Sequence, residues 1–180
     1  MSKSDPGFSL VELLMVMAIA IILMAIALPT LGTSDRTRVD NAAREVQQEL
    51  QSARLRAVGN NRRLEVRFNC PATGQYRLVE AGWTGSDRCS PTAFPYPAPP
   101  DAAYNAKPRL DGPVRYLNNR VLLAASSSNL VIQFLPNGQT ARLQGTTSTL
   151  IGTGGEVLTL SIGSYSRTVN VNGLGRVQLQ

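Results

Sequence analysis

The sequence predicts an α+β protein in which a long N-terminal helix, first hydrophobic and then amphipathic, packs on an antiparallel β-sheet or β-sandwich head. Three observations predict it: an apolar run near the start, a helical period after it, and a change to a period of two from residue 64 onward. The expected limits are a hydrophobic helix over residues 8–34, an amphipathic helix over 35–59 and a β head over 60–180.

The first element is the hydrophobic helix. Every residue from 13 to 28 is apolar, and the stretch from Phe8 to Leu31 comprises 24 residues. As a helix it is about 36 Å long, whereas the hydrocarbon core of a bilayer is about 30 Å thick. The stretch is therefore long enough to span a membrane, and Pro29 and Gly32 are predicted to disturb the helix near its end.

The second element is an amphipathic helix. Between residues 36 and 58 apolar side chains recur every three or four positions and so share one face. They are Val39, Ala43, Val46, Leu50, Ala53 and Ala57. Gly59 and the two asparagines after it are predicted to end the helix, because these residue types tolerate the left-handed conformation.

The remaining chain is predicted to form β-structure. Leu64, Val66 and Phe68 alternate with charged residues, which is typical of a strand with one buried face. The turn signals predict the following pairs: residues 75–80 pairing back across 71–74, a hairpin over 130–144, a second hairpin joining 156–162 to 167–171, and a last strand at 176–179. Seven prolines between residues 90 and 113 predict a surface loop there.

The composition argues against several classes of function. Histidine is absent, which removes the commonest general base and metal ligand, so no enzyme activity, cofactor or metal centre is expected. The two cysteines, Cys70 and Cys89, cannot complete a four-ligand zinc site. In a small extracytoplasmic domain they indicate one disulfide, and two reduced buried thiols are the alternative. The net charge of +6 bears on association and solubility rather than on fold.

Glu12 separates three interpretations of the apolar segment. A secretory signal peptide is supported by the Ala-Ile-Ala pattern at 25–27, but Lys3 at its start is offset by Asp5 and Glu12. A simple membrane anchor leaves Glu12 unexplained, because an ionisable residue in a spanning helix costs about 2.5 to 3.5 kcal/mol at the centre and usually has a partner. Cleavage before Phe8 would create an α-amino group that a neighbouring, staggered subunit could bring to Glu12.

The stretch GFSLVE at residues 7–12, followed by the apolar run and Pro29, resembles the class III signal and N-terminal helix of type IV pilins and type II secretion pseudopilins. The resemblance implies that a prepilin peptidase cuts between Gly7 and Phe8, removes residues 1–7 as a leader and N-methylates Phe8. It also implies that Glu12 and Pro29 belong to the segment that assembles into a filament. The residue before the glycine is proline, where many leaders have lysine or arginine.

Three later stretches are similar to the GspH/FimT family of minor subunits: residues 49–68, the hairpin 131–143 with Phe134 and Gly138, and 167–179 with its Gly-Arg pair. The resemblance implies a minor pilin or pseudopilin of a type II secretion pseudopilus or type IV pilus, acting in filament initiation or at the tip. Its implied partners are the prepilin peptidase, other minor and major pilins or pseudopilins, the bacterial inner membrane and secreted cargo. The head would then lie in the periplasm.

Two alternatives stay open. Some FimT-like minor pilins bind DNA during natural transformation through a Gly-Arg-x-Arg motif, but residues 175–178 here are Gly-Arg-Val-Gln, without the second arginine. The candidates for a DNA-binding cluster are Arg62, Arg63, Arg67, Arg167 and Arg176. A scattered basic surface is favoured over such a cluster. The other alternative is a secreted or singly anchored β domain of unknown binding role.

Overall fold

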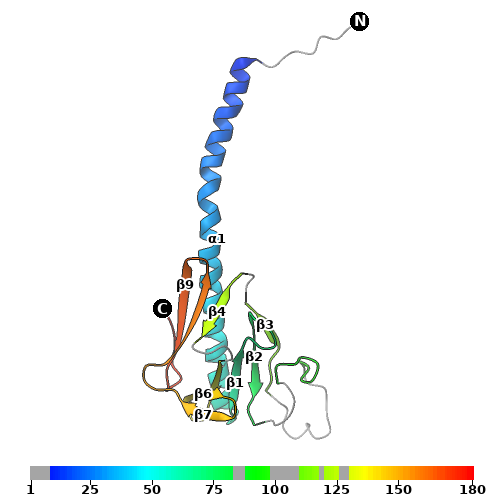
Figure 1. Cartoon of the computed structure of the whole chain (residues 1–180), viewed down its shortest axis with the longest axis vertical. Coiled ribbons are helices and arrows are strands. Elements are labelled where there is room, and N and C mark those ends of the chain that lie inside the picture. Colours follow the sequence, from blue (N-terminus) through cyan, green and yellow to red (C-terminus); the bar gives the residue numbers. More distant parts are fainter. Residues whose placement is uncertain (1–8, 83–87, 98–109, 118–119, 126–129) are drawn as a thin grey trace.

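The structure is a computed structural model that describes residues 9–82, 88–97, 110–117, 120–125 and 130–180. Of residues 25–34 and Ala125 it describes only the backbone. One helix, α1 (Leu10–Gly59), projects from the head with its first half and packs on the head with its second half (Figure 1). It ends at Gly59, as predicted.

The helix continues through Pro29 and Gly32, so the predicted disturbance at these residues is wrong. A proline in a helix interior removes one backbone donor and costs about 3 kcal/mol, and a glycine costs about 1 kcal/mol. The proline removes one backbone donor, and the helix continues on both sides of it. The hydrophobic and amphipathic segments therefore join in one gently curved helix (Figure 1).

The predicted apolar stripe of α1 is confirmed. All six of its side chains are at most 1% exposed, and they pack in one core with residues of both sheets. Leu50 is fully buried, and burial of a leucine side chain contributes about 1.5 to 3 kcal/mol. Burial of this face thus holds the second half of the helix on the head.

The head consists of two antiparallel sheets, one of six strands in the order β3-β2-β1-β5-β6-β7 and one of four in the order β10-β9-β8-β4. The strands are β1 (Leu64–Phe68), β2 (Gln75–Glu80), β3 (Val114–Tyr116), β4 (Leu122–Ala125), β5 (Val131–Phe134), β6 (Thr140–Gln144), β7 (Thr147–Leu150), β8 (Glu156–Ile162), β9 (Tyr165–Val171) and β10 (Val177–Leu179). The helix contacts β1 and β5 of the first sheet and β8, β9 and β10 of the second. The core therefore lies between the helix and both sheets.

The predicted hairpins are confirmed, since β1 pairs with β2, β5 with β6 and β8 with β9. The predicted last strand is β10, which pairs with β9. Sequence patterns did not predict β3, β4 or β7. These strands have only three or four residues, and β7 exposes every side chain, so no alternation of buried and exposed positions marks it.

Tyr76 on β2 ties the first sheet to the helix. Its side chain is 1% exposed, and its hydroxyl donates a hydrogen bond to Glu45 Oε1 at 3.1 Å. Burial of the phenol, together with the negative charge of Glu45, raises the pKa of Tyr76 well above its ordinary value. Because folding favours the protonated phenol, its contribution to stability is complete below about pH 10 and is lost as the pH rises further.

We expect Tyr76→Phe to lower the free energy of unfolding by about 1 kcal/mol near neutral pH, because one hydrogen bond is lost. The variant should also lose less stability than the wild type when the pH rises above about 10. Urea unfolding of the full chain at neutral and alkaline pH checks both effects. Tyr116→Phe, at an exposed tyrosine of β3, is the matched control. The same alkaline loss in wild type and Tyr76→Phe would contradict the assignment.

Candidate assembly site

The side chains that the structure describes in the first half of α1 form an exposed, largely apolar surface. From Leu10 to Met24 the side chains are exposed, with Leu10 at 75% and Met24 at 68%. Within the described residues, no helical segment is long and apolar enough to cross a membrane. An apolar surface of this extent marks a site for contact with another protein or with lipid.

Glu12 lies in the first turn of this helix. Its side chain is exposed, and among the described residues it forms no ion pair or hydrogen bond. The helix begins after Ser9, whose side chain makes no capping bond. A carboxylate near a helix N-terminus is stabilised by the helix dipole, and this one is also free to accept a partner from outside the chain.

The other residues of the predicted processing and assembly site are less fully described. Gly7 and Phe8 lie outside the described residues, so cleavage and methylation there stay predictions. Pro29 has a helical backbone within α1. Its role in assembly stays a prediction as well.

The arginines considered for DNA binding come from separate parts of the head. Arg62 donates to both carboxylate oxygens of Glu80, at 3.2 and 3.1 Å. Arg67 on β1 pairs with Glu65 at 2.7 Å, and Arg167 on β9 pairs with Asp40 of α1 at 2.5 Å. Arg63 is exposed, and Arg176 borders a hollow beside the helix. Because three of the five pair with carboxylates, less positive charge is free for phosphate contact. DNA binding stays a prediction.

The predicted disulfide between Cys70 and Cys89 is confirmed, with a Cα–Cα distance of 5.0 Å. Sequence reasoning missed the two buried arginines beside it. Arg77 on β2 is 1% exposed and donates to the carbonyl oxygens of Gly112 at 2.9 Å and Ser90 at 3.4 Å. It also donates to the carbonyl oxygen of Phe94. Arg77 therefore anchors the described part of the proline-rich loop to β2.

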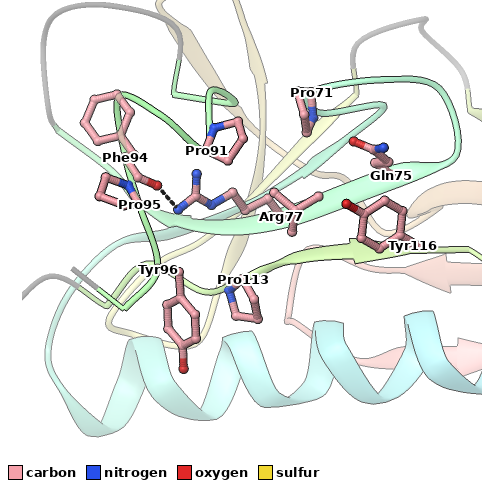
Figure 2. A pocket seen from close by; sticks show the side chains of 10 residues that line it. Pro71, Gln75, Arg77, Pro91, Phe94, Pro95, Tyr96, Pro113 and Tyr116 are labelled. Carbon is pink, nitrogen blue, oxygen red and sulfur yellow. Dashed lines mark hydrogen bonds between the residues drawn. The ribbon is translucent and has the colours of Figure 1, made fainter. Parts of the chain in front are cut away.

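The second arginine, Arg88, acts in the same region. It donates to the Glu80 carbonyl at 2.8 Å and to Asp111 Oδ1 at 3.0 Å, and its guanidinium lies 4.5 Å from the centre of the Phe94 ring. Figure 2 shows a hollow beside Arg77, with prolines around the Arg77 side chain and with Tyr96 and Tyr116 at its margin. Its volume is about 270 Å³. Proline-rich segments offer carbonyl acceptors but few N–H donors, and this is the signal that could have predicted an arginine partner.

Arg54 joins the two turns that carry the family-like motifs. Its Nε donates to the carbonyl oxygen of Gly138 at 3.3 Å and its Nη2 to that of Leu174 at 3.1 Å. Gly138 and Gly175 have φ angles of +82° and +77°, a conformation that favours glycine. The helix, the 136–138 turn and the 172–175 turn thus meet at one guanidinium.

A single helix that exposes apolar side chains from Leu10 to Met24 and buries one face of its second half against a β head defines a pilin-like subunit. Residues 2–28 match the prokaryotic N-terminal methylation motif, and residues 42–175 match type II transport protein GspH. The chain belongs to the GspH family of type II transport proteins, because that match covers well over half of its length. The family consists of structural pilin or pseudopilin subunits rather than enzymes, and membership implies association with other such subunits.

The fold is similar to that of a solved pilin. The type IV minor pilin FimU of Pseudomonas aeruginosa superposes with a TM-score of 0.51 at 15% identity, covering 81% of this chain and 90% of that chain. A second crystal structure of FimU has a TM-score of 0.48 at 16% identity, covering 78% of this chain and 91% of that chain. At this identity the first likeness shows the α+β fold alone. No curated protein matches the sequence significantly.

Proposed function

We propose that this chain is a minor subunit of a type II secretion pseudopilus or type IV pilus, acting in filament initiation or at the tip. The observation that carries the proposal is Glu12 in the first turn of a helix whose apolar side chains are exposed. Exposed apolar surface favours insertion into the inner membrane before assembly and packing against other stalks afterwards. The head would then lie in the periplasm, where the Cys70–Cys89 disulfide is stable.

Glu12 has a specific role in this proposal. After cleavage between Gly7 and Phe8, the new α-amino group of one subunit pairs with the Glu12 carboxylate of its neighbour. The pair neutralises both charges in an apolar bundle and sets the stagger between stalks. The match of residues 2–28 to the N-terminal methylation motif supports both the cleavage and the N-methylation of Phe8.

The experiment that tests the proposal is mass spectrometry of the N-terminal peptide from the membrane-bound chain. The expected first residue is N-methylated Phe8, and Gly7→Val should leave the leader attached because it removes the small residue at the cleavage site. A first residue of Leu28 would restore the signal-peptide interpretation. Retention of Met1 in the wild type would exclude processing at Gly7.

A further inference from the structure

β7 is an edge strand without the usual protection. In the part of the chain that the structure describes, no strand pairs with its outer side. Edge strands present unpaired N–H and C=O groups to other chains, and proteins commonly protect them with charged residues, proline or a bulge. No charged residue and no proline occurs between Arg142 and Glu156, and all four β7 side chains are exposed.

The other three edges differ from β7. β3 has Arg115 at its centre and follows Pro113, and β10 has three residues and follows Arg176. β4 is followed directly by residues 126–129, which lie outside the described ranges. Among the edges whose flanks are described, β7 is the one that is open to strand addition.

The register of the β6–β7 hairpin determines which backbone groups of β7 face outward. The N–H of Ile151 donates to the carbonyl oxygen of Thr140 at 3.0 Å, so the backbone N–H of Ile151 faces β6. Hydrogen-bonded and non-hydrogen-bonded pairs alternate along an antiparallel ladder. The N–H and C=O of Thr149 therefore face β6, whereas those of Ser148 and Leu150 face outward.

Side chains on the outer face of the sheet hold this edge in place. Ser148 Oγ donates to Gln133 Oε1 at 2.9 Å, and Gln133 Nε2 donates to Glu65 Oε1 at 3.2 Å. Glu65 also pairs with Arg67, and Gln133 and Glu65 are each only 4% exposed. The chain of bonds runs from β1 to β7. An edge that is already ordered loses less conformational entropy when a partner binds.

The end of β7 adjoins exposed apolar side chains. Leu150 is 63% exposed and Leu174 is 72% exposed, and both line a hollow of about 250 Å³. The hollow is lined by uncharged residues only. An apolar side chain on an added strand would bury its surface here, and a charged one would lose hydration without gaining a partner.

We propose that β7 accepts an extended, uncharged segment of a neighbouring pilin-like subunit as an added strand. The outward groups of Ser148 and Leu150 hydrogen-bond its backbone, and the hollow at Leu150 and Leu174 takes an apolar side chain. The identity of the partner rests on the proposed function: stalks in a filament run parallel, and β7 lies at the end of the head opposite the start of α1 (Figure 1). This end faces the next subunit toward the tip.

Site-specific photo-crosslinking of the full-length chain in its native host tests the proposal. A benzophenone amino acid replaces Leu174, which lies beside the edge but not on it. We expect an adduct with another pilin-like subunit, identified by mass spectrometry of the crosslinked peptide. Ser148→Pro should reduce this adduct about tenfold, because it removes an outward N–H and adds a ring that obstructs pairing. Ser148→Ala loses the same bond to Gln133 but keeps the N–H, so it should reduce the adduct much less than Ser148→Pro does.

The outcomes separate this inference from the proposed function. Four results overturn the strand-addition proposal, even if the N-terminus is N-methylated Phe8. They are an undiminished adduct in Ser148→Pro, an adduct with a second copy, an adduct with a protein outside the pilin class, and no adduct at all. If Ser148→Pro unfolds at a lower temperature than Ser148→Ala, Leu150→Lys replaces it in the experiment. A charged side chain on the edge opposes strand addition, and the lysine leaves the backbone pairing of β6 with β7 unchanged.

Discussion

Glu12→Ala should leave the chain in the membrane and processed at Gly7, yet reduce its incorporation into filaments about a hundredfold. The reason is the proposed pairing of the Glu12 carboxylate with the amino group of a neighbour's Phe8. Removing one member of a buried ion pair leaves the other charge without a partner in an apolar bundle, at a cost of about 3 kcal/mol or more. Membrane insertion should not suffer, because the variant replaces a charge by an apolar side chain.

The measurement is the ratio of full-length chain in purified filaments to that in membranes, determined by immunoblot, with the N-terminus checked by mass spectrometry. Ser9→Ala is the matched control, since Ser9 precedes the same helical turn and its side chain makes no capping bond. It should assemble normally. Assembly of Glu12→Ala at the wild-type level would remove the pairing from the proposal.

Gly175→Ala should destabilise the head by about 3 kcal/mol, combining the cost of a positive φ with that of overpacking. A Cβ at Gly175 would overlap the carbonyl oxygen of Gly138 and lie 2.9 Å from Cδ of Arg54. The Arg54 side chain can move, but the Gly138 backbone belongs to a tight turn. Relief of the overlap therefore has to separate the two turns and break both Arg54 hydrogen bonds.

Gly74→Ala separates the two causes of this loss. Gly74 has the same φ of +77° as Gly175, but a Cβ there would meet nothing within 4 Å. Gly74→Ala should lower the free energy of unfolding by about 1 kcal/mol from backbone strain alone. Denaturant unfolding of both full-length variants checks the difference. Equal losses would show that close packing of the two turns contributes nothing.

Much of the fold follows from periodicity in the sequence. The stripe on α1, the end of the helix at Gly59 and three hairpins are confirmed because each is encoded by neighbouring residues: apolar spacing, glycine and asparagine turns, and alternation on one strand. The prediction at Pro29 is wrong because a proline removes only one backbone donor, and the helix continues on both sides of it.

The candidate site divides in the same way. Gly7, Phe8 and Glu12 are recognisable in sequence because processing and assembly depend on a short contiguous stretch. The sequence did not reveal the roles of Arg54, Arg77 and the buried Glu65, because these side chains bind partners on other elements of the fold. Arg54 has its carbonyl acceptors 84 and 120 residues away along the chain, so in the sequence it cannot be distinguished from an arginine on the surface.

The sequence alone determined the class of this protein: an apolar helix with one carboxylate near its start, an amphipathic continuation and a β head with a single cysteine pair. Only the tertiary structure decided how the head is closed and which of its edges stays open. Sheet order depends on contacts between distant segments, and the sequence does not show which strand lies at an edge of its sheet. The open edge at β7 and the junction at Arg54 became visible only when residues 54, 138, 148 and 174 were placed in space.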